Sequence, residues 1–132
     1  MAVTTSGERV LIVEDDPSTR LGLTELVRTW GFTSESAANG EEALERVTEF
    51  RPSIVISDMV MPGMGGRALA TELANRKHNV PIVLMSGYTR DSLAGNSELG
   101  SGGAFIEKPF TPDKLLKKIN DVLEAARAPA QS

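Results

Sequence analysis

Five polar residues that could take part in chemistry lie at or just after the ends of short apolar segments. They are Glu14, Asp15, Asp58, Ser86 and Lys108. Carboxylates held close together repel each other, by about 4 kcal/mol for a pair ~4 Å apart at an effective dielectric constant of about 20. A cluster of them therefore needs a bound cation or raised pKa values. An open site that offers only oxygen ligands favours Mg²⁺ over zinc or copper.

A divalent cation beside an exposed aspartate, with a lysine and a hydroxyl group, provides what phosphoryl transfer requires. The cation and Lys108 would neutralise the charge that develops on the transferred group, and the Ser86 hydroxyl would donate a hydrogen bond to one of its oxygens. Asp58 would then be the nucleophile and would form an aspartyl phosphate.

The hydrophobic pattern predicts the elements that must position these residues. We expect strands over 10–13, 32–37, 54–56, 81–85 and 104–106, and helices that begin near residues 17, 40, 66 and 112. This alternation predicts an α/β fold, in which a parallel sheet carries helices on both faces, and the continuously apolar central strands agree with it. Ligands of such sheets bind beyond the carboxyl ends of the strands. The polar residues should therefore converge at that edge.

Local signals mark where several helices begin and end. We expect Asp16 to be the N-cap of the first helix rather than a metal ligand, because Pro17 follows it. Thr111 is expected to cap the last helix. Gly31 should close the first helix, and Pro52 should stop the second.

Composition limits the classes of protein to consider. The chain has 132 residues, no cysteine and a net charge of −4, which together suit one domain without disulfides and disfavour direct nucleic-acid binding. It has no apolar run of the ~20 residues that a membrane span needs and no signal peptide, so we expect a cytoplasmic protein. We expect a tail over 1–8, a domain over 9–126 and a tail or linker over 127–132, with no DNA-binding output domain in this chain.

Four segments together resemble the receiver domain of two-component response regulators. They are VLIVEDDP at 10–17, ISDMVMPGM at 56–64, LMSG at 84–87 and IEKPF at 106–110. The resemblance implies a flavodoxin-like, doubly wound fold whose five-stranded parallel sheet has the order 2-1-3-4-5. It also implies that Asp58 accepts a phosphoryl group from a sensor histidine kinase or a histidine phosphotransfer protein, and that an unidentified downstream protein then responds.

The resemblance further implies a set of magnesium ligands around Asp58. Asp15 and Asp58 would ligate Mg²⁺ directly, together with the backbone carbonyl of Val60. Glu14 would contribute through water. Glutamate stands at this position where aspartate is commoner in the family, which makes its link to the metal longer and less direct.

Ser86 and Lys108 are the residues that the resemblance places on the phosphoryl oxygens. The Lys108–Pro109 bond is expected to be cis, a geometry essentially confined to bonds before proline, and it would direct the lysine over the site. Ser86 and Phe105 would form the switch. Many receivers have tyrosine where Phe105 stands, so we expect a buried ring and a muted switch.

The residues two positions after Asp58 and Ser86 influence how fast water reaches the phosphoryl group in this family. Here they are Val60 and Tyr88, and neither offers much to orient water. We therefore predict slow self-dephosphorylation.

The resemblance also implies contacts with a kinase and a longer parent chain. The residues that would meet the helices of a kinase are Pro17, Ser18, Leu21 and Gly22. An exposed leucine at position 21 would also be ordinary. The LMSGYT segment at 84–89 and the glycine-rich stretch after it resemble receivers attached to hybrid histidine kinases, which favours such a receiver over a single-domain regulator.

Two other functions compete with a signalling module. A Mg²⁺-dependent phosphatase that uses Asp58 in turnover would usually need a second general acid near it, but Val60 occupies the nearby position and no insertion could form a cap. A nucleotide-binding module would need a glycine-rich phosphate loop after the first strand, where acidic residues stand instead. We therefore expect a phosphoacceptor that is not a turnover enzyme.

Overall fold

The computed structural model describes residues 8–86 and 103–127. Several predictions concern residues outside these ranges: those for most of the two tails, for the glycine-rich stretch and for Tyr88. The residues that lie outside the described ranges are 1–7, 87–102 and 128–132.

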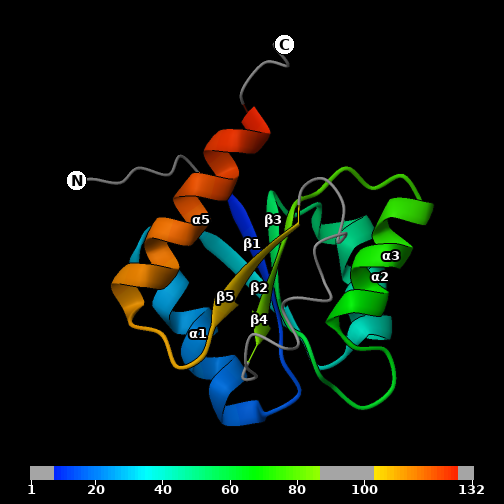
Figure 1. Ribbon diagram of the computed structural model, residues 1–132, viewed down its shortest axis with the longest axis horizontal. Helices are drawn as coiled ribbons and strands as arrows, with labels where there is room; N and C mark the ends of the chain where they lie inside the picture. Colours follow the sequence, from blue (N-terminus) through cyan, green and yellow to red (C-terminus); the bar gives the residue numbers. More distant parts are fainter. Residues whose placement is uncertain (1–7, 87–102, 128–132) are drawn as a thin grey trace.

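The described chain alternates strands with helices (Figure 1). The elements are β1 (Arg9–Val13), α1 (Pro17–Thr29), β2 (Thr33–Ala37), α2 (Gly40–Phe50), β3 (Ile54–Asp58), α3 (Gly66–Asn75), β4 (Ile82–Ser86), β5 (Gly103–Glu107) and α5 (Pro112–Arg127). Helix α5 extends one residue into the segment predicted to be a tail. Among the described residues, no helix is both long and apolar enough to cross a membrane.

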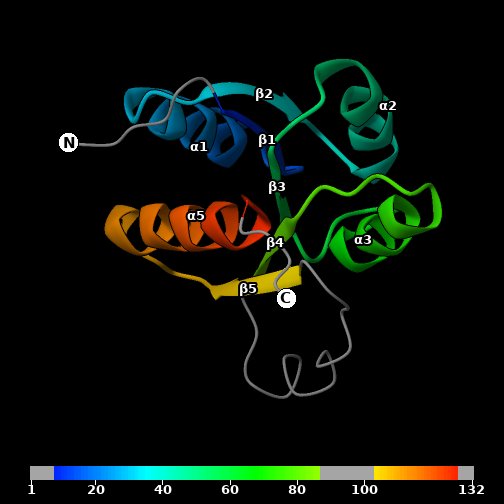
Figure 2. The ribbon, with the colours of Figure 1, turned by 90° about the horizontal axis from the view of Figure 1, so that it is seen from above.

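The five strands form one parallel sheet in the order β2-β1-β3-β4-β5, which confirms the predicted doubly wound arrangement. Figure 2 shows α1 and α5 on one face of the sheet, with α2 and α3 on the other. Because β1 lies between β2 and β3, the strand order reverses beside it. The ends of β1 and β3 therefore lie next to each other at the switch point, where such sheets bind ligands.

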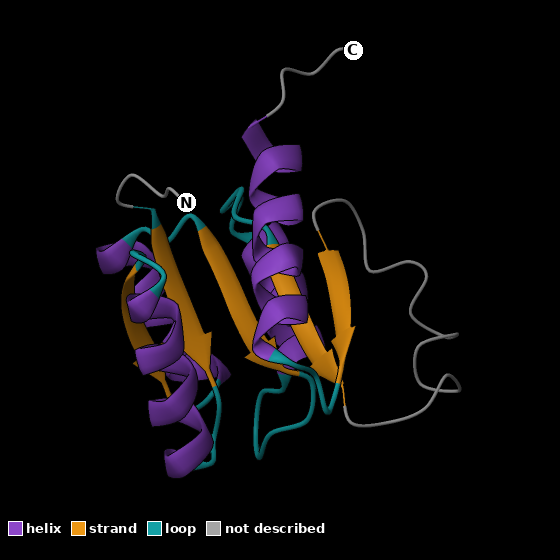
Figure 3. Cartoon of the chain, turned by 90° about the vertical axis from the view of Figure 1, so that its left-hand side faces the viewer, coloured by secondary structure: helices purple, strands orange, loops and turns teal. Residues whose placement is uncertain are grey.

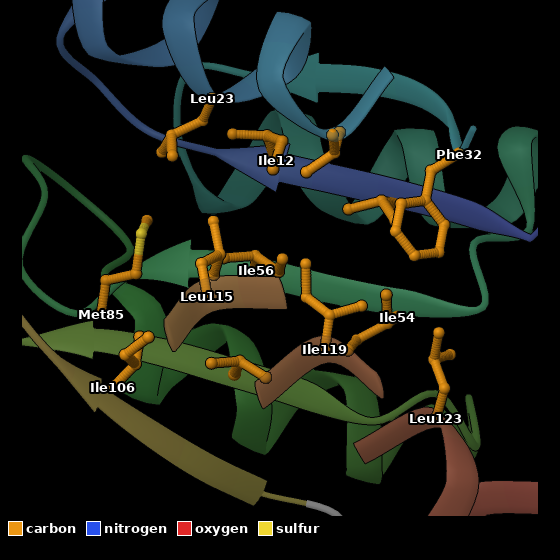
Figure 4. Packing of buried hydrophobic residues seen from close by; sticks show 13 residues of the cluster. Ile12, Leu23, Phe32, Ile54, Ile56, Met85, Ile106, Leu115, Ile119 and Leu123 are labelled. Carbon is orange, nitrogen blue, oxygen red and sulfur yellow. The ribbon is translucent and has the colours of Figure 1, made fainter. Parts of the chain in front are cut away.

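Each face of the sheet covers its own hydrophobic core. Ile12, Ile56 and Leu115 belong to the core under α1 and α5 (Figure 4). Leu11 and Leu84 belong to the core under α2 and α3. Successive residues of a strand point to opposite faces, so the central strands must be apolar throughout to fill both cores.

Side-chain caps start α1, α2 and α5 where the sequence predicts them, whereas Gly65 before α3 offers no side-chain cap. The Asp16 carboxylate accepts hydrogen bonds from the backbone N–H of Thr19 at 2.9 Å and from its hydroxyl at 2.7 Å. These hydrogen bonds from Thr19 lower the pKa of Asp16. Thr111 accepts from the N–H of Lys114 at 3.2 Å, and Asn39 caps α2 in the same way. Asp16 is therefore a capping residue.

The end of α2 shows a feature that local sequence signals did not predict. The helix ends at Phe50, and Arg51 before Pro52 adopts the left-handed region with φ 55°. Nε of Arg9 donates to the carbonyl oxygens of Phe50 and Arg51, at 2.9 and 3.1 Å. The first residue of β1 thus satisfies carbonyl groups at the end of this helix, which have no partner within it. Gly31, after α1, has φ 95°, as a helix-closing glycine should.

Candidate functional site

The predicted polar residues lie at one edge of the sheet. Asp58 and Ser86 are the last residues of β3 and β4, Glu14 follows β1 directly, and Lys108 follows β5 directly. Figure 3 shows the arrowheads of the strands at the same edge of the molecule. The parallel direction of the strands thus brings together residues that are far apart in the sequence.

Three carboxylates converge at this edge. One oxygen from each of Glu14, Asp15 and Asp58 lies within 4.8 Å of the other two. The register of β1 against β3 pairs Val13 with Ser57, so Glu14 and Asp58 leave the sheet side by side. Oxygens at this spacing could share one hard cation such as Mg²⁺.

Lys108 approaches the carboxylates from β5. Its Nζ lies 3.5 Å from Oδ2 of Asp58 and 3.8 Å from Oε1 of Glu14. The Lys108–Pro109 peptide bond is cis, and the backbone N–H of Lys108 donates to the carbonyl of Ser86 at 2.8 Å. The lysine therefore supplies a positive charge at the carboxylate that was predicted to react.

Glu14 is the buried member of the acidic cluster. It is 2% exposed, and its Oε2 accepts a hydrogen bond from the backbone N–H of Asp16 at 3.1 Å. Its buried Oε1 has no hydrogen-bond partner among the described residues. Burial raises the pKa of Glu14, and the charges of Asp58 and Asp15 raise it further, whereas the hydrogen bond from Asp16 and the charge of Lys108 lower it.

The Oε1 of Glu14 has Lys108 at 3.8 Å but no hydrogen-bond partner among the described residues, which favours a cation at this site. A buried carboxylate oxygen without a partner is destabilising. A metal ion, or water bound to one, would satisfy it and would offset the repulsion among the three carboxylates. The donor set is made only of oxygens, which fits magnesium.

The remaining predicted residues surround this cluster at different depths. Ser86 is 1% exposed and pairs with Glu107, whereas Asp58 pairs with Met85, so Ser86 lies one residue further along the edge. Val60, in the loop after β3, is 60% exposed. Phe105 is partly buried and packs against the core under α2 and α3.

Two residues that shape the site were not singled out from the sequence. Nη1 of Arg20, on α1, donates to the backbone carbonyl of Glu14 at 2.9 Å. Gly66 begins α3 so close to β3 that an added Cβ would lie 2.5 Å from the carbonyl oxygen of Asp58. The glycine pair at 65–66 is a signal that could have been noticed, whereas nothing in the local pattern indicates the contact of Arg20.

Comparison with known proteins decides the family. Residues 10–120 match the profile of the response regulator receiver domain. This chain belongs to that family. As a receiver domain, it signals through phosphorylation rather than through substrate turnover, and the resemblance seen in the four sequence motifs is confirmed.

Relatives of different lengths share this receiver domain. The chain is 32% identical over 117 residues to the chemotaxis protein CheY of Thermotoga maritima, covering 88% of this chain and 98% of that protein. It is 36% identical over 117 residues to the sensor kinase CckA of Brucella abortus, covering 87% of this chain but 12% of that protein. The chain thus spans only a small part of CckA.

A solved receiver structure, whose sequence is about as similar to this chain as the relatives above, has the same fold. The receiver domain of a signal transduction histidine kinase from Syntrophus aciditrophicus is 28% identical and has a TM-score of 0.81, covering 96% of this chain and 98% of that one.

Proposed function

We propose that Asp58 accepts a phosphoryl group from the phospho-histidine of a sensor histidine kinase or a histidine phosphotransfer protein. The observation that carries this proposal is the convergence of Glu14, Asp15 and Asp58 within 4.8 Å, with Lys108 at 3.5 Å from Asp58. We take Asp58 as the reacting group because it is the last residue of β3, its Oδ2 lies 3.5 Å from Nζ of Lys108, and its side chain remains 14% exposed. A carboxylate oxygen would form the new bond to phosphorus as the bond from phosphorus to the histidine nitrogen breaks.

The charges of this chain would prepare Asp58 for an anionic donor. Lys108 would neutralise charge on the phosphoryl oxygens, and the Ser86 hydroxyl would donate a hydrogen bond to one of them. Ser86 ends β4, the strand next to β3, and Lys108 follows β5 and already lies 3.5 Å from Asp58, so both stand at the edge where the phosphoryl group would be bound. The new group would add about −1.5 to −2 units of charge and three acceptor oxygens.

Asp15, Asp58 and the backbone carbonyl of Val60 would hold magnesium directly, and Glu14 would hold it through water. When bound, the ion neutralises negative charge on the transferred group. The charge of Lys108 alone does not balance three carboxylates. Acid repulsion is thus one reason why phosphorylation should require the metal.

Phosphorylation would be read out by a shift between two arrangements of Ser86 and Phe105. Without a hydroxyl group, the Phe105 ring gains nothing from an outward position, so the shift should be small. Slow self-dephosphorylation remains part of the proposal, because the exposed Val60 side chain has no polar group to orient an attacking water.

The partner surface proposed for the kinase lies at the start of α1. Its residues are Pro17, Ser18, Leu21 and Gly22, all of which are exposed. Leu21 is 59% exposed, and a Cβ added at Gly22 would meet nothing within 4 Å. Similarity to CckA and to the receiver of a Syntrophus histidine kinase supports attachment to a histidine kinase in a longer, cytoplasmic chain.

Labelling with acetyl phosphate tests the proposal. With Mg²⁺, the wild-type protein should gain one phosphoryl group that resists acid and is released by hydroxylamine, and Asp58→Asn should gain none. Asp16→Asn is the matched control, because Asp16 caps α1 outside the cluster and asparagine is also a good cap. Continuous phosphate release by the wild type, absence of labelling, or equal labelling of Asp58→Asn would overturn the proposal.

A further inference from the structure

Arg20 connects α1 to the three acidic residues that follow β1, Glu14 to Asp16, which we call the acidic corner. Its Nη1 donates to the backbone carbonyl of Glu14 at 2.9 Å, in a partly buried contact that spans six residues of the chain. Its own backbone N–H donates to the carbonyl of Asp16 at 2.8 Å in the first turn of the helix. The base of this side chain is therefore held by the helix, and its end is held by the corner.

The corner is restrained at Glu14 more than at Asp15. The N–H of Glu14 donates to the carbonyl of Ala37 in β2 at 3.0 Å, its carbonyl accepts from Arg20, and its Oε2 accepts from the N–H of Asp16. Asp15 is exposed, and its carboxylate makes no hydrogen bond with the described residues. The direction of the Asp15 side chain thus depends on the backbone that precedes it.

The carbonyl of Glu14 and the N–H of Asp15 belong to one planar peptide group. A hydrogen bond that fixes the carbonyl therefore also fixes the orientation of the N–H and the position of the Cα of Asp15. We propose that Arg20 is a positioning residue, which orients the Glu14–Asp15 peptide so that the Asp15 carboxylate faces the magnesium site. This inference rests on the proposed function.

The sign of the effect separates positioning from simple electrostatics. Arg20 carries a positive charge, so if it acted only through its charge, removing it would strengthen the binding of Mg²⁺. If it positions Asp15, removing it weakens binding despite the loss of a repelling charge. Outer groups that hold metal ligands in place typically contribute 10–100-fold in affinity.

Arg28 offers a matched control on the same helix. Its Nη2 donates to the backbone carbonyl of Ser34 at 2.8 Å, so it makes the same type of contact with a strand. Ser34 lies near the beginning of β2, at the edge of the sheet opposite the carboxylates. Removing Arg28 therefore costs a similar hydrogen bond without touching the acidic corner.

The test is a calorimetric titration of the full chain with MgCl₂, together with thermal unfolding in the absence of the metal. Arg20→Met should weaken Mg²⁺ binding by about 10-fold, whereas Arg28→Met should change it by less than about twofold. Arg20→Lys keeps the charge but loses the fixed fork of the guanidinium, so it should also bind more weakly. If Arg20→Met does not fold, Mg²⁺ binding by Arg20→Lys tests the inference in its place.

Binding by the Arg20 variants that equals or exceeds wild-type binding would overturn this inference, as would an equal loss in Arg28→Met. These outcomes are distinct from failure of the proposed function. If the wild-type protein neither binds Mg²⁺ nor is labelled by acetyl phosphate, the proposed function fails.

Discussion

Replacing Glu14 with glutamine should stabilise the metal-free protein and weaken its binding of magnesium. The substitution removes a buried charge but keeps the size of the side chain and an oxygen that can accept from the N–H of Asp16. Glu14 is 2% exposed, and its Oε1 has no hydrogen-bond partner among the described residues. The ionised form is therefore unfavourable in the folded state until a cation is present.

The distances give the size of this effect. At an effective dielectric constant of about 20, a second carboxylate oxygen no more than 4.8 Å away repels Glu14 by at least about 3.5 kcal/mol, and Lys108 at 3.8 Å attracts it by about 4.4 kcal/mol. At this limiting distance, the two repulsions exceed the one attraction by about 2.5 kcal/mol. Water around the exposed Asp15 and the partly exposed Lys108 reduces all of these values, so we expect Glu14→Gln to stabilise the metal-free protein by about 1–3 kcal/mol.

The stabilisation should depend on pH with a definite sign. Because the pKa of Glu14 is raised in the folded state, the unfolded chain loses this proton first as pH rises. The free energy of unfolding of the wild type therefore falls as the pH rises from near the ordinary pKa of 4.5 to the raised pKa of Glu14 in the folded state. The advantage of Glu14→Gln should be absent well below this window and complete above it.

Urea unfolding with a chelator, at neutral and at acid pH, measures this advantage. Glu107→Gln is the matched control, since Glu107 is exposed outside the cluster and should show no such change. With free Mg²⁺ ~100-fold above its Kd, the wild type gains about 2.7 kcal/mol, and the advantage of the variant should shrink or reverse. If metal-free Glu14→Gln is no more stable than the wild type at neutral pH, the reasoning is refuted.

Two further substitutions test the contacts around Asp58. Lys108→Ala should slow the labelling of Asp58 by acetyl phosphate by on the order of 10²–10³-fold, because it removes a charge that stabilises the transferred group. Lys114→Ala, which removes an exposed lysine, is the control and should be labelled at the wild-type rate. Equal labelling rates for the two variants would contradict the role of Lys108. Gly66→Ala places a Cβ 2.5 Å from the Asp58 carbonyl oxygen and should lower the free energy of unfolding in urea by about 1–3 kcal/mol. A Cβ added at Gly22 meets nothing within 4 Å, so Gly22→Ala should raise the free energy of unfolding by about 0.5–1 kcal/mol. A Gly66→Ala protein as stable as the wild type would exclude the close contact with Asp58.

The sequence alone determined the class of fold and the edge of the sheet at which the site lies. Apolar runs such as Val10 to Val13 can be buried only if both faces of the sheet are covered, and strand–helix alternation makes the strands parallel. The residue after each strand then falls at the same edge, which is how Asp58 and Lys108 could be associated 50 residues apart. Caps such as Asp16 were also predictable, because they act within one helical turn.

The tertiary structure alone decided which atoms meet. Nε of Arg9 donates to the carbonyl oxygens of Phe50 and Arg51 at the end of α2, where Arg51 has a left-handed backbone, although 41 residues separate Arg9 from Phe50. Similarly, only the fold decides that Glu14 is buried with an oxygen that has no hydrogen-bond partner among the described residues, and that Arg20 donates to the carbonyl before Asp15. Periodicity reports which face of an element is buried, whereas these contacts depend on distances of a few ångströms between segments that no local pattern relates.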